Sequence, residues 1–185
     1  MKKMSANQER KLLRALENCK PIGRGSSRIV YVHPFNKNLI VKVAVGANAF
    51  KQNVCERKVY DALGDEYCAR IEAYGRFCIV MERLVRIYDY YDFEEEMPDE
   101  VSYVMDALTD FLGDTEDNYQ IGKTADGRFV AYDYGFSTDA DEQCGWAQEV
   151  YSKAYLIQAR KILVQKRPIN TVEKLDLETL QGYKN

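Results

Sequence analysis

The pattern of apolar and polar residues along the first third of the chain predicts a helix, three strands and a second helix. Residues 5–19 show helical spacing, and Pro21 ends that pattern. Residues 22–45 hold three β-branched and aromatic runs, separated by Gly, Ser, Pro and Asn, as expected for strands joined by tight connections. Residues 48–63 return to helical spacing and end at Gly64. The apolar positions of the two helices are Leu12, Leu13 and Leu16, followed by Phe50, Val54, Val59, Tyr60 and Leu63.

The middle of the chain predicts two more strands, a helix and a hairpin. The strands cover residues 70–77 and 77–84, with a Gly-Arg turn between them. Residues 87–100 are acidic and aromatic and predict a short helix and a loop. Residues 100–112 carry apolar residues at helical spacing, including Phe111 near the end. A polar loop and a hairpin with an Ala-Asp-Gly turn follow.

A last helical pattern covers residues 141–166, and the tail after it is polar. This order of elements predicts an α+β domain built in two parts. The first, residues 1–84, would hold the N-terminal helix and an antiparallel sheet with one further helix. The second, residues 85–185, would be mainly helical.

Composition and charge narrow the class of protein. The net charge is −3 over 185 residues, so no basic excess points to a nucleic-acid partner. No segment reaches the roughly 20 apolar residues needed to cross a membrane, and the charged N-terminus has no apolar stretch of signal-peptide length. Five cysteines without a Cys-x-x-Cys element fit free thiols in the cytoplasm. The sequence leaves the oligomeric state open.

A glycine- and serine-rich segment lies between the first two predicted strands. Gly23 and Gly25 are followed by Ser26, Ser27 and, within the next strand, Val30. Glycines allow a backbone to approach phosphates closely and to present N–H donors to them. A simple hairpin turn is the alternative interpretation.

Lys42 lies inside an apolar strand, where an unpaired ammonium would be costly to bury. The side chain could extend to solvent at one face of the strand. It could also pair with Glu56, midway along the following helix, if that glutamate points inward instead of toward water. Further on, Asp133 stands at the end of a predicted strand, before Tyr134 and Gly135. An aspartate there can hold a metal ion against phosphates, or can be ordinary loop chemistry.

The order and spacing of these features resemble the protein-kinase-like superfamily over about residues 20–137, in particular short kinase-like proteins of phages and bacteria. The resemblance implies a reduced two-lobed fold with a truncated, mainly helical second lobe. Gly23, Gly25 and Val30 match the family's Gly-rich loop, Lys42 its strand lysine and Glu56 its helix glutamate. Met81–Leu84 match the hinge that binds adenine. Asp133–Gly135 match the Asp-Phe-Gly motif, with Tyr in place of Phe.

The chain departs from the family pattern at the loop and at the catalytic segment. Arg28 stands in place of the third loop glycine. Counting back thirteen residues from Asp133 places Gln120 where the family has a metal-binding asparagine. Five residues earlier is Thr115, which cannot act as a base, so a one-residue bulge would be needed to bring Asp114 into that position. Two nearby residues are alternatives, Asp117 for the base and Asn118 for the metal.

The resemblance implies an ATP- and Mg²⁺-dependent phosphotransferase that acts on Ser or Thr of a protein. Lys42, held by Glu56, would orient phosphates, and Asp114 would accept the proton of the attacking hydroxyl. The metal ligands would be Asp133, Gln120 and Asn118, and the ATP contacts would be Gly23, Gly25, Ser26, Ser27, Val30, Lys42, Glu82 and Leu84.

Two alternatives remain open at this point. The chain has only fifty residues after Gly135 and no Ala-Pro-Glu segment, so the usual platform for a protein substrate is missing. One alternative is a pseudokinase that acts by binding or inhibiting a protein partner, with or without nucleotide. Such a protein needs neither a substrate platform nor an intact catalytic segment. A small-molecule kinase would also suit a short C-terminal region.

Overall fold

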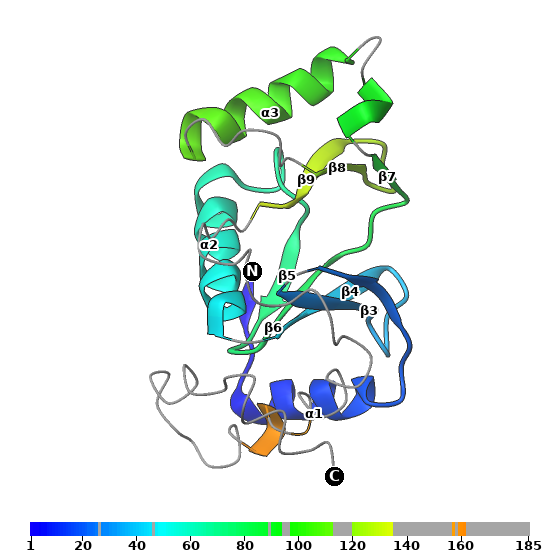
Figure 1. Cartoon of the computed structure of the whole chain (residues 1–185), viewed down its shortest axis with the longest axis vertical. Helices are drawn as coiled ribbons and strands as arrows, with labels where there is room; N and C mark the ends of the chain where they lie inside the picture. The colour runs from blue at the N-terminus through cyan, green and yellow to red at the C-terminus, as the bar shows by residue number, and fades with distance from the viewer. Residues whose placement is uncertain are drawn as a thin grey trace.

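Figure 1 shows a computed structural model of the chain, which describes residues 1–25, 27–45, 47–88, 90–93, 97–112, 120–134, 157 and 159–161. The protein is α+β, with a mixed six-stranded sheet, a three-stranded sheet and helices against both. The elements in chain order are β1 (Lys2–Lys3), α1 (Ala6–Leu16), β2 (Pro21–Arg24), β3 (Arg28–Val32), β4 (Leu39–Ala44), α2 (Ala47–Leu63), β5 (Ile71–Tyr74), β6 (Cys78–Glu82), β7 (Arg86–Tyr88), the 3-10 helix η1 (Tyr90–Phe93), α3 (Asp99–Leu112), β8 (Gln120–Lys123) and β9 (Phe129–Asp133).

The six-stranded sheet has the order β1-β5-β6-β4-β3-β2. All neighbours are antiparallel except β1, which pairs in parallel with β5. The predicted glycine-rich hairpin, the lysine strand and the strand leading to the predicted hinge are therefore adjacent. In Figure 1, α1 lies below this sheet, α2 runs alongside it, and α3 lies at the opposite end with the smaller sheet.

Strand β6 is buried on both faces and joins two parts of the core. Alternate residues of a strand point to opposite faces. Cys78 and Val80 accordingly pack with the leucines of α1, and Ile79 and Met81 pack with α2, α3 and the β8–β9 hairpin. The uninterrupted apolar run of β6 is what a strand covered on both sides requires.

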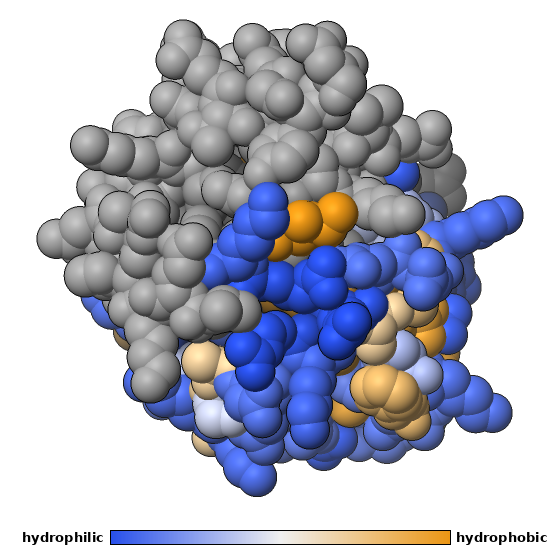
Figure 2. Space-filling model, turned by 90° about the horizontal axis from the view of Figure 1, so that it is seen from below, coloured by the Kyte–Doolittle hydropathy of each residue, from blue (hydrophilic) through white to orange (hydrophobic). Residues whose placement is uncertain are grey.

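Helix α1 forms because its ends are capped and one side is apolar. The Ser5 side chain accepts from the N–H of Gln8, and the Gln8 side chain accepts from the N–H of Ser5, which makes a capping box. Leu12, Leu13 and Leu16 pack on the sheet as the spacing predicted. Among the coloured, described residues of the face seen from below in Figure 2, hydrophilic side chains predominate, in keeping with the polar residues on the outer side of α1.

The smaller sheet has the order β7-β8-β9 and contacts α3 through β9. The predicted β8–β9 hairpin is confirmed, and Gly127 in its turn has a φ of +93°, which glycine adopts at little cost. The short helix and loop predicted from Ile87 onward are wrong at their start, because β7 is a strand paired with β8. Tyr88 also stacks near the ring of Phe129, so tertiary pairing outweighs the local pattern.

Two apolar residues predicted for helix cores are exposed instead: Val54 of α2 at 42% and Phe111 of α3 at 47%. The buried side of α2 carries Asn53, Glu56 and Val59. Of the predicted helix 141–166, only residues 157 and 159–161 are described, and these are helical. Across the described ranges, no helix combines the length and apolar character that a membrane span requires.

Candidate functional site

The register of the large sheet places the predicted loop and lysine residues in one row. Gly23 of β2 is paired with Val30 of β3, and Val30 is paired with Lys42 of β4. Directly opposite residues of an antiparallel pair point to the same face. A Cβ at Gly23 would lie at an ordinary contact distance, 3.6 Å, from the Val30 Cβ. The row therefore leads from the glycine-rich hairpin to the lysine.

Arg28 lies on the same face as this row, because it precedes Val30 by two positions in β3. Its side chain is buried, as is that of Lys42. Two cations on one buried face need anionic partners, since an unpaired buried charge is costly.

Helix α2 supplies the first of those anions. Glu56 points toward the sheet and is 0% exposed. Its Oε1 accepts from Lys42 Nζ at 2.7 Å, and its Oε2 accepts from Arg28 Nη1 at 2.5 Å. One carboxylate is thus shared between both cations in the protein interior, where charge-assisted hydrogen bonds are strong.

The β8–β9 hairpin supplies the second anion. Asp133 ends β9, its side chain is 41% exposed, and its Oδ1 lies 4.0 Å from Lys42 Nζ. The same Oδ1 forms an ion pair with Arg28 Nη2. The four side chains make a closed group of two cations and two carboxylates, which come from three separate parts of the chain.

Gln120 lies opposite Asp133 in the β8–β9 pair. The register shifts by one residue next to this pair, at Tyr132, as in a β-bulge. The carbonyl oxygen of Tyr132 accepts from Lys42 Nζ. The irregularity thus provides Lys42 with a third oxygen and turns Asp133 and Gln120 to one face of the hairpin.

The pKa of the Arg28 guanidinium is raised above its ordinary value despite burial. Burial lowers the pKa, but the nearby carboxylates of Glu56 and Asp133 outweigh that effect. Arg28 therefore remains a cation at any pH at which the protein is folded.

Among the residues that the structure describes, no hydrogen bond is made by one backbone N–H group of the predicted hinge. Glu82 N–H bonds Arg70 O at 2.9 Å, Arg83 N–H bonds Asn38 O at 2.8 Å, and Val85 N–H bonds Lys123 O at 2.8 Å. In the described part of the chain, these bonds account for each N–H from 82 to 85 except that of Leu84.

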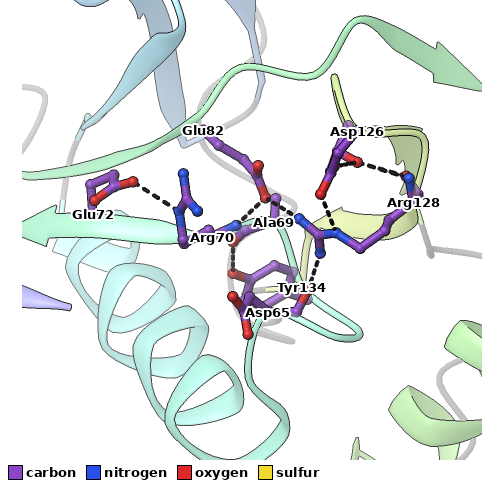
Figure 3. Close-up of polar contacts among 9 residues, drawn as sticks. Asp65, Ala69, Arg70, Glu72, Glu82, Asp126, Arg128 and Tyr134 are labelled. Atoms are coloured by element: carbon purple, nitrogen blue, oxygen red, sulfur yellow. Dashed lines mark hydrogen bonds and ion pairs between the residues drawn. The ribbon is translucent and has the colours of Figure 1, made fainter.

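The Glu82 side chain is engaged elsewhere. Figure 3 shows its carboxylate between the backbone N–H of Arg70 and the guanidinium of Arg128, at 2.7 and 3.9 Å from Oε1. The Glu82 carboxylate is therefore already engaged within the protein. This contact also holds the hinge to the β8–β9 hairpin, on which Arg128 lies.

Tyr134, next to Asp133, is buried and fixed by a hydrogen bond from its hydroxyl to Ala69 O at 3.0 Å (Figure 3). Desolvation by burial, with the Glu56 carboxylate nearby, raises the pKa of Tyr134 well above its ordinary value. The hydroxyl therefore stays protonated and keeps its donor role. This anchor positions the end of β9, and with it Asp133.

The described residues contain no group of three His, Cys, Asp or Glu side chains placed to hold a metal ion. The Asp133 carboxylate and the Gln120 amide on the opposite strand are nevertheless the oxygen donors that Mg²⁺ takes, since this ion uses few protein ligands together with phosphates. The donor set fits such an ion, provided that Arg28 leaves Asp133.

Several predicted site residues lie outside the described residues, and their placement is not part of the geometry above. They are Ser26, Asp114, Thr115, Asp117, Asn118 and Gly135. Ser27 is described and bonds the side chain of Gln52 on α2. Gly25 lies in the turn, with its N–H bonded to Arg28 O at 2.9 Å.

The sequence interpretation noted Arg28 only as a missing glycine and did not place it in the site. One signal was available: Arg28 and Val30 are two apart in a predicted strand, and Val30 was already matched to the loop over the nucleotide. Nothing in the sequence indicates that the Tyr132 carbonyl bonds Lys42, because that contact depends on a local shift of register.

Comparison of the sequence with protein-family models and with curated proteins gives no match.

Proposed function

We propose that the protein is an ATP- and Mg²⁺-dependent phosphotransferase with a reduced two-lobed, kinase-like fold. The acceptor would be Ser or Thr of a protein, in the cytoplasm where ATP is available. The observation that supports the proposal most is the buried Lys42–Glu56 pair at 2.7 Å, with Asp133 at 4.0 Å from the same Nζ. A strand lysine held by a helix glutamate next to a strand-end aspartate is the arrangement by which kinases position phosphates.

The proposed roles follow from position and charge. Glu56 would hold Lys42 so that its ammonium orients the α- and β-phosphates, and the β2–β3 hairpin, in which Gly23 pairs with Val30, would cover them. The Leu84 N–H would meet the adenine ring. Asp133 and Gln120 would hold Mg²⁺, which when bound neutralises phosphate charge. Asp114 remains the proposed acceptor of the hydroxyl proton.

A pseudokinase that works by binding a protein partner is the second candidate. One observation favours it: Arg28 already pairs with Asp133, the main proposed metal ligand. A site neutralised by its own side chains can persist without nucleotide, and the fold could then serve as a scaffold. The two candidates share the fold and differ in phosphate transfer.

The test compares the wild type with Lys42→Met and Asp133→Ala, using labelled ATP, Mg²⁺ and a generic protein acceptor. Loss of a single phosphate-orienting charge should lower transfer by about 10²- to 10³-fold. Lys37→Met is the matched control, because Lys37 is exposed on a turn of the same sheet. It should transfer phosphate as the wild type does.

Thermal unfolding with and without Mg–ATP separates the candidates. Binding at a hundred times Kd stabilises the folded state by about 2.7 kcal/mol. Transfer that needs Lys42 and Asp133 supports the enzyme. A thermal shift without transfer supports the pseudokinase, and no shift with any common nucleotide would contradict both nucleotide-dependent versions.

A further inference from the structure

The guanidinium of Arg28 occupies the place beside Asp133 that a metal ion would take. Its Nη2 pairs with Asp133 Oδ1, while its Nη1 bonds Glu56 Oε2 at 2.5 Å. A guanidinium matches two carboxylates in this way because its donors form a rigid planar fork. The two nitrogens therefore connect α2 to the end of β9 directly.

Burial protects the Glu56 half of this contact from solvent, whereas the Asp133 side chain is 41% exposed. Arg28 is 5% exposed and Glu56 is 0% exposed, so solvent does not compete for the pair. With Lys42 included, the group holds two cations and two carboxylates, and its net charge is zero. The site is thus electrostatically complete without any bound ligand.

A divalent cation and the guanidinium compete for the Asp133 carboxylate, because both are positive and Arg28 already holds Oδ1. Mg²⁺ binds carboxylate oxygens at about 2.1 Å, and Oδ1 is already in direct contact with Arg28 and 4.0 Å from Lys42 Nζ. Adding two positive charges there would place three cationic groups around one carboxylate. Metal binding is therefore opposed for as long as Arg28 stays on Asp133.

We propose that Arg28 is an internal competitor of the metal ion: it holds Asp133 in the empty site and must release that carboxylate before Mg–nucleotide binds. The inference rests on the proposed nucleotide site and adds its regulation. Released from Asp133, Arg28 would remain paired with Glu56. Changes that weaken the Arg28–Asp133 contact should therefore favour metal and nucleotide binding.

The test measures binding of Mn²⁺ in the presence of ADP, with Mn²⁺ as a paramagnetic substitute followed by electron paramagnetic resonance. Arg28→Met removes the charge and keeps an apolar side chain. Arg28→Lys keeps the charge but lacks the two guanidinium nitrogens that contact Glu56 and Asp133. Both variants should bind Mn–ADP about tenfold more tightly than the wild type, as expected for the loss of one competing charge-assisted bond. Arg70→Met, which removes an exposed arginine paired with Glu72, is the matched control and should bind as the wild type does.

Each outcome is decisive. Wild-type binding of Mn–ADP that is unchanged or weakened in the folded Arg28 variants overturns the competitor role and leaves the proposed function intact. If a variant binds Mn–ADP and the wild type does not, the competitor role is strongly supported. No binding by any folded form overturns the proposed function, and the competitor role with it.

A measurement on the wild type covers the case in which a variant fails to fold. In ¹⁵N-labelled protein, the side-chain N–H signals of Arg28 should shift as Mg–ADP is added, because one nitrogen leaves its carboxylate. Unchanged signals in a protein that binds Mg–ADP would contradict the proposal.

Discussion

At the scale of single residues, Glu9 determines how α1 meets the sheet. Its side chain is buried and accepts from the backbone N–H groups of Arg76, Phe77 and Cys78 at 2.9, 2.6 and 3.1 Å. The first two of these N–H groups lie in the β5–β6 turn and the third begins β6, and a Cβ at Gly75 in the same turn would clash with the Glu9 carboxylate. The Glu9 carboxylate therefore provides hydrogen bonds for backbone N–H groups that would otherwise need water.

Glu9→Gln should alter the pH dependence of stability. Desolvation by burial, partly offset by the backbone hydrogen bonds, raises the pKa of Glu9 above 4.5. The folded protein thus holds the proton more readily than the unfolded chain. The stabilisation is complete below the unfolded pKa and is lost as pH rises through the folded pKa, at about 1.4 kcal/mol for each unit of difference.

Urea unfolding of the wild type and Glu9→Gln from pH 4 to pH 8 measures this effect. The advantage of the wild type in free energy of unfolding should shrink as pH rises. Val54→Ala, at an exposed position of α2, changes no titratable group and should give a curve parallel to that of the wild type. Parallel curves for Glu9→Gln as well would contradict the raised pKa.

The buried side of α2 was not predicted correctly from the apolar pattern. In α2 the expected core residue Val54 is exposed, and Asn53 and Glu56 are buried in its stead. Periodicity assumes that the buried side of a helix is apolar, and here the buried side carries a charge that pairs with Lys42. The resemblance to kinases predicted that pairing, whereas composition and spacing alone left it open.

At the scale of elements, the smaller sheet depends on a close approach of β7 to β8. A Cβ at Gly122 would meet Leu84 Cδ1 at 2.3 Å and Arg86 O at 2.9 Å. The second contact is to backbone, so β7 itself must shift to accommodate a larger residue. This glycine therefore allows Leu84 and β7 to lie close to the β8–β9 hairpin.

Gly122→Ala should therefore destabilise the protein by about 1–3 kcal/mol, as overpacking does. Gly23→Ala is the matched comparison, since its Cβ would meet Val30 at an ordinary 3.6 Å and should change stability by less than about 0.5 kcal/mol. Chemical denaturation measures both, and hydrogen exchange should show faster opening of β7 in Gly122→Ala alone. Equal stability of the two variants would contradict the close approach.

The helices and strands of the large sheet were largely predictable, because amphipathic spacing and turn residues agree with the tertiary structure there. β1 and β7 were not predicted. Each is only two or three residues long and exists through pairing with a distant segment, residues 73–74 for β1 and 121–123 for β7. A single-sequence pattern carries little information on such pairings.

At the scale of the whole molecule, β6 couples two core clusters that lie on opposite faces of one sheet. Leu13 and Cys78 belong to the α1 side, and Cys68 belongs to the side built by α2, α3 and the hairpin. Burial raises the pKa of the Cys68 thiol to about 12 and that of Cys78 well above its ordinary value. Both thiols are therefore protected from alkylation unless the protein opens.

Leu13→Ala should lower the free energy of unfolding by about 2–5 kcal/mol, because Leu13 is fully buried. If the two clusters unfold as one, the alkylation rates of Cys68 and Cys78 should rise by the same factor, as read by peptide mass analysis. Val54→Ala, at an exposed site, is the control and should change neither rate. Faster labelling of Cys78 alone would mean that the α1 side opens independently.

Strand β1 has a consequence for how copies of the protein behave at high concentration. The outer edge of any sheet offers unpaired N–H and C=O groups to neighbouring molecules. In the six-stranded sheet, the edge next to β5 is formed by Lys2 and Lys3 of β1, and both side chains are exposed. Two positive charges on the terminal strand repel the same strand of another copy, so this short element protects β5 from edge-to-edge aggregation.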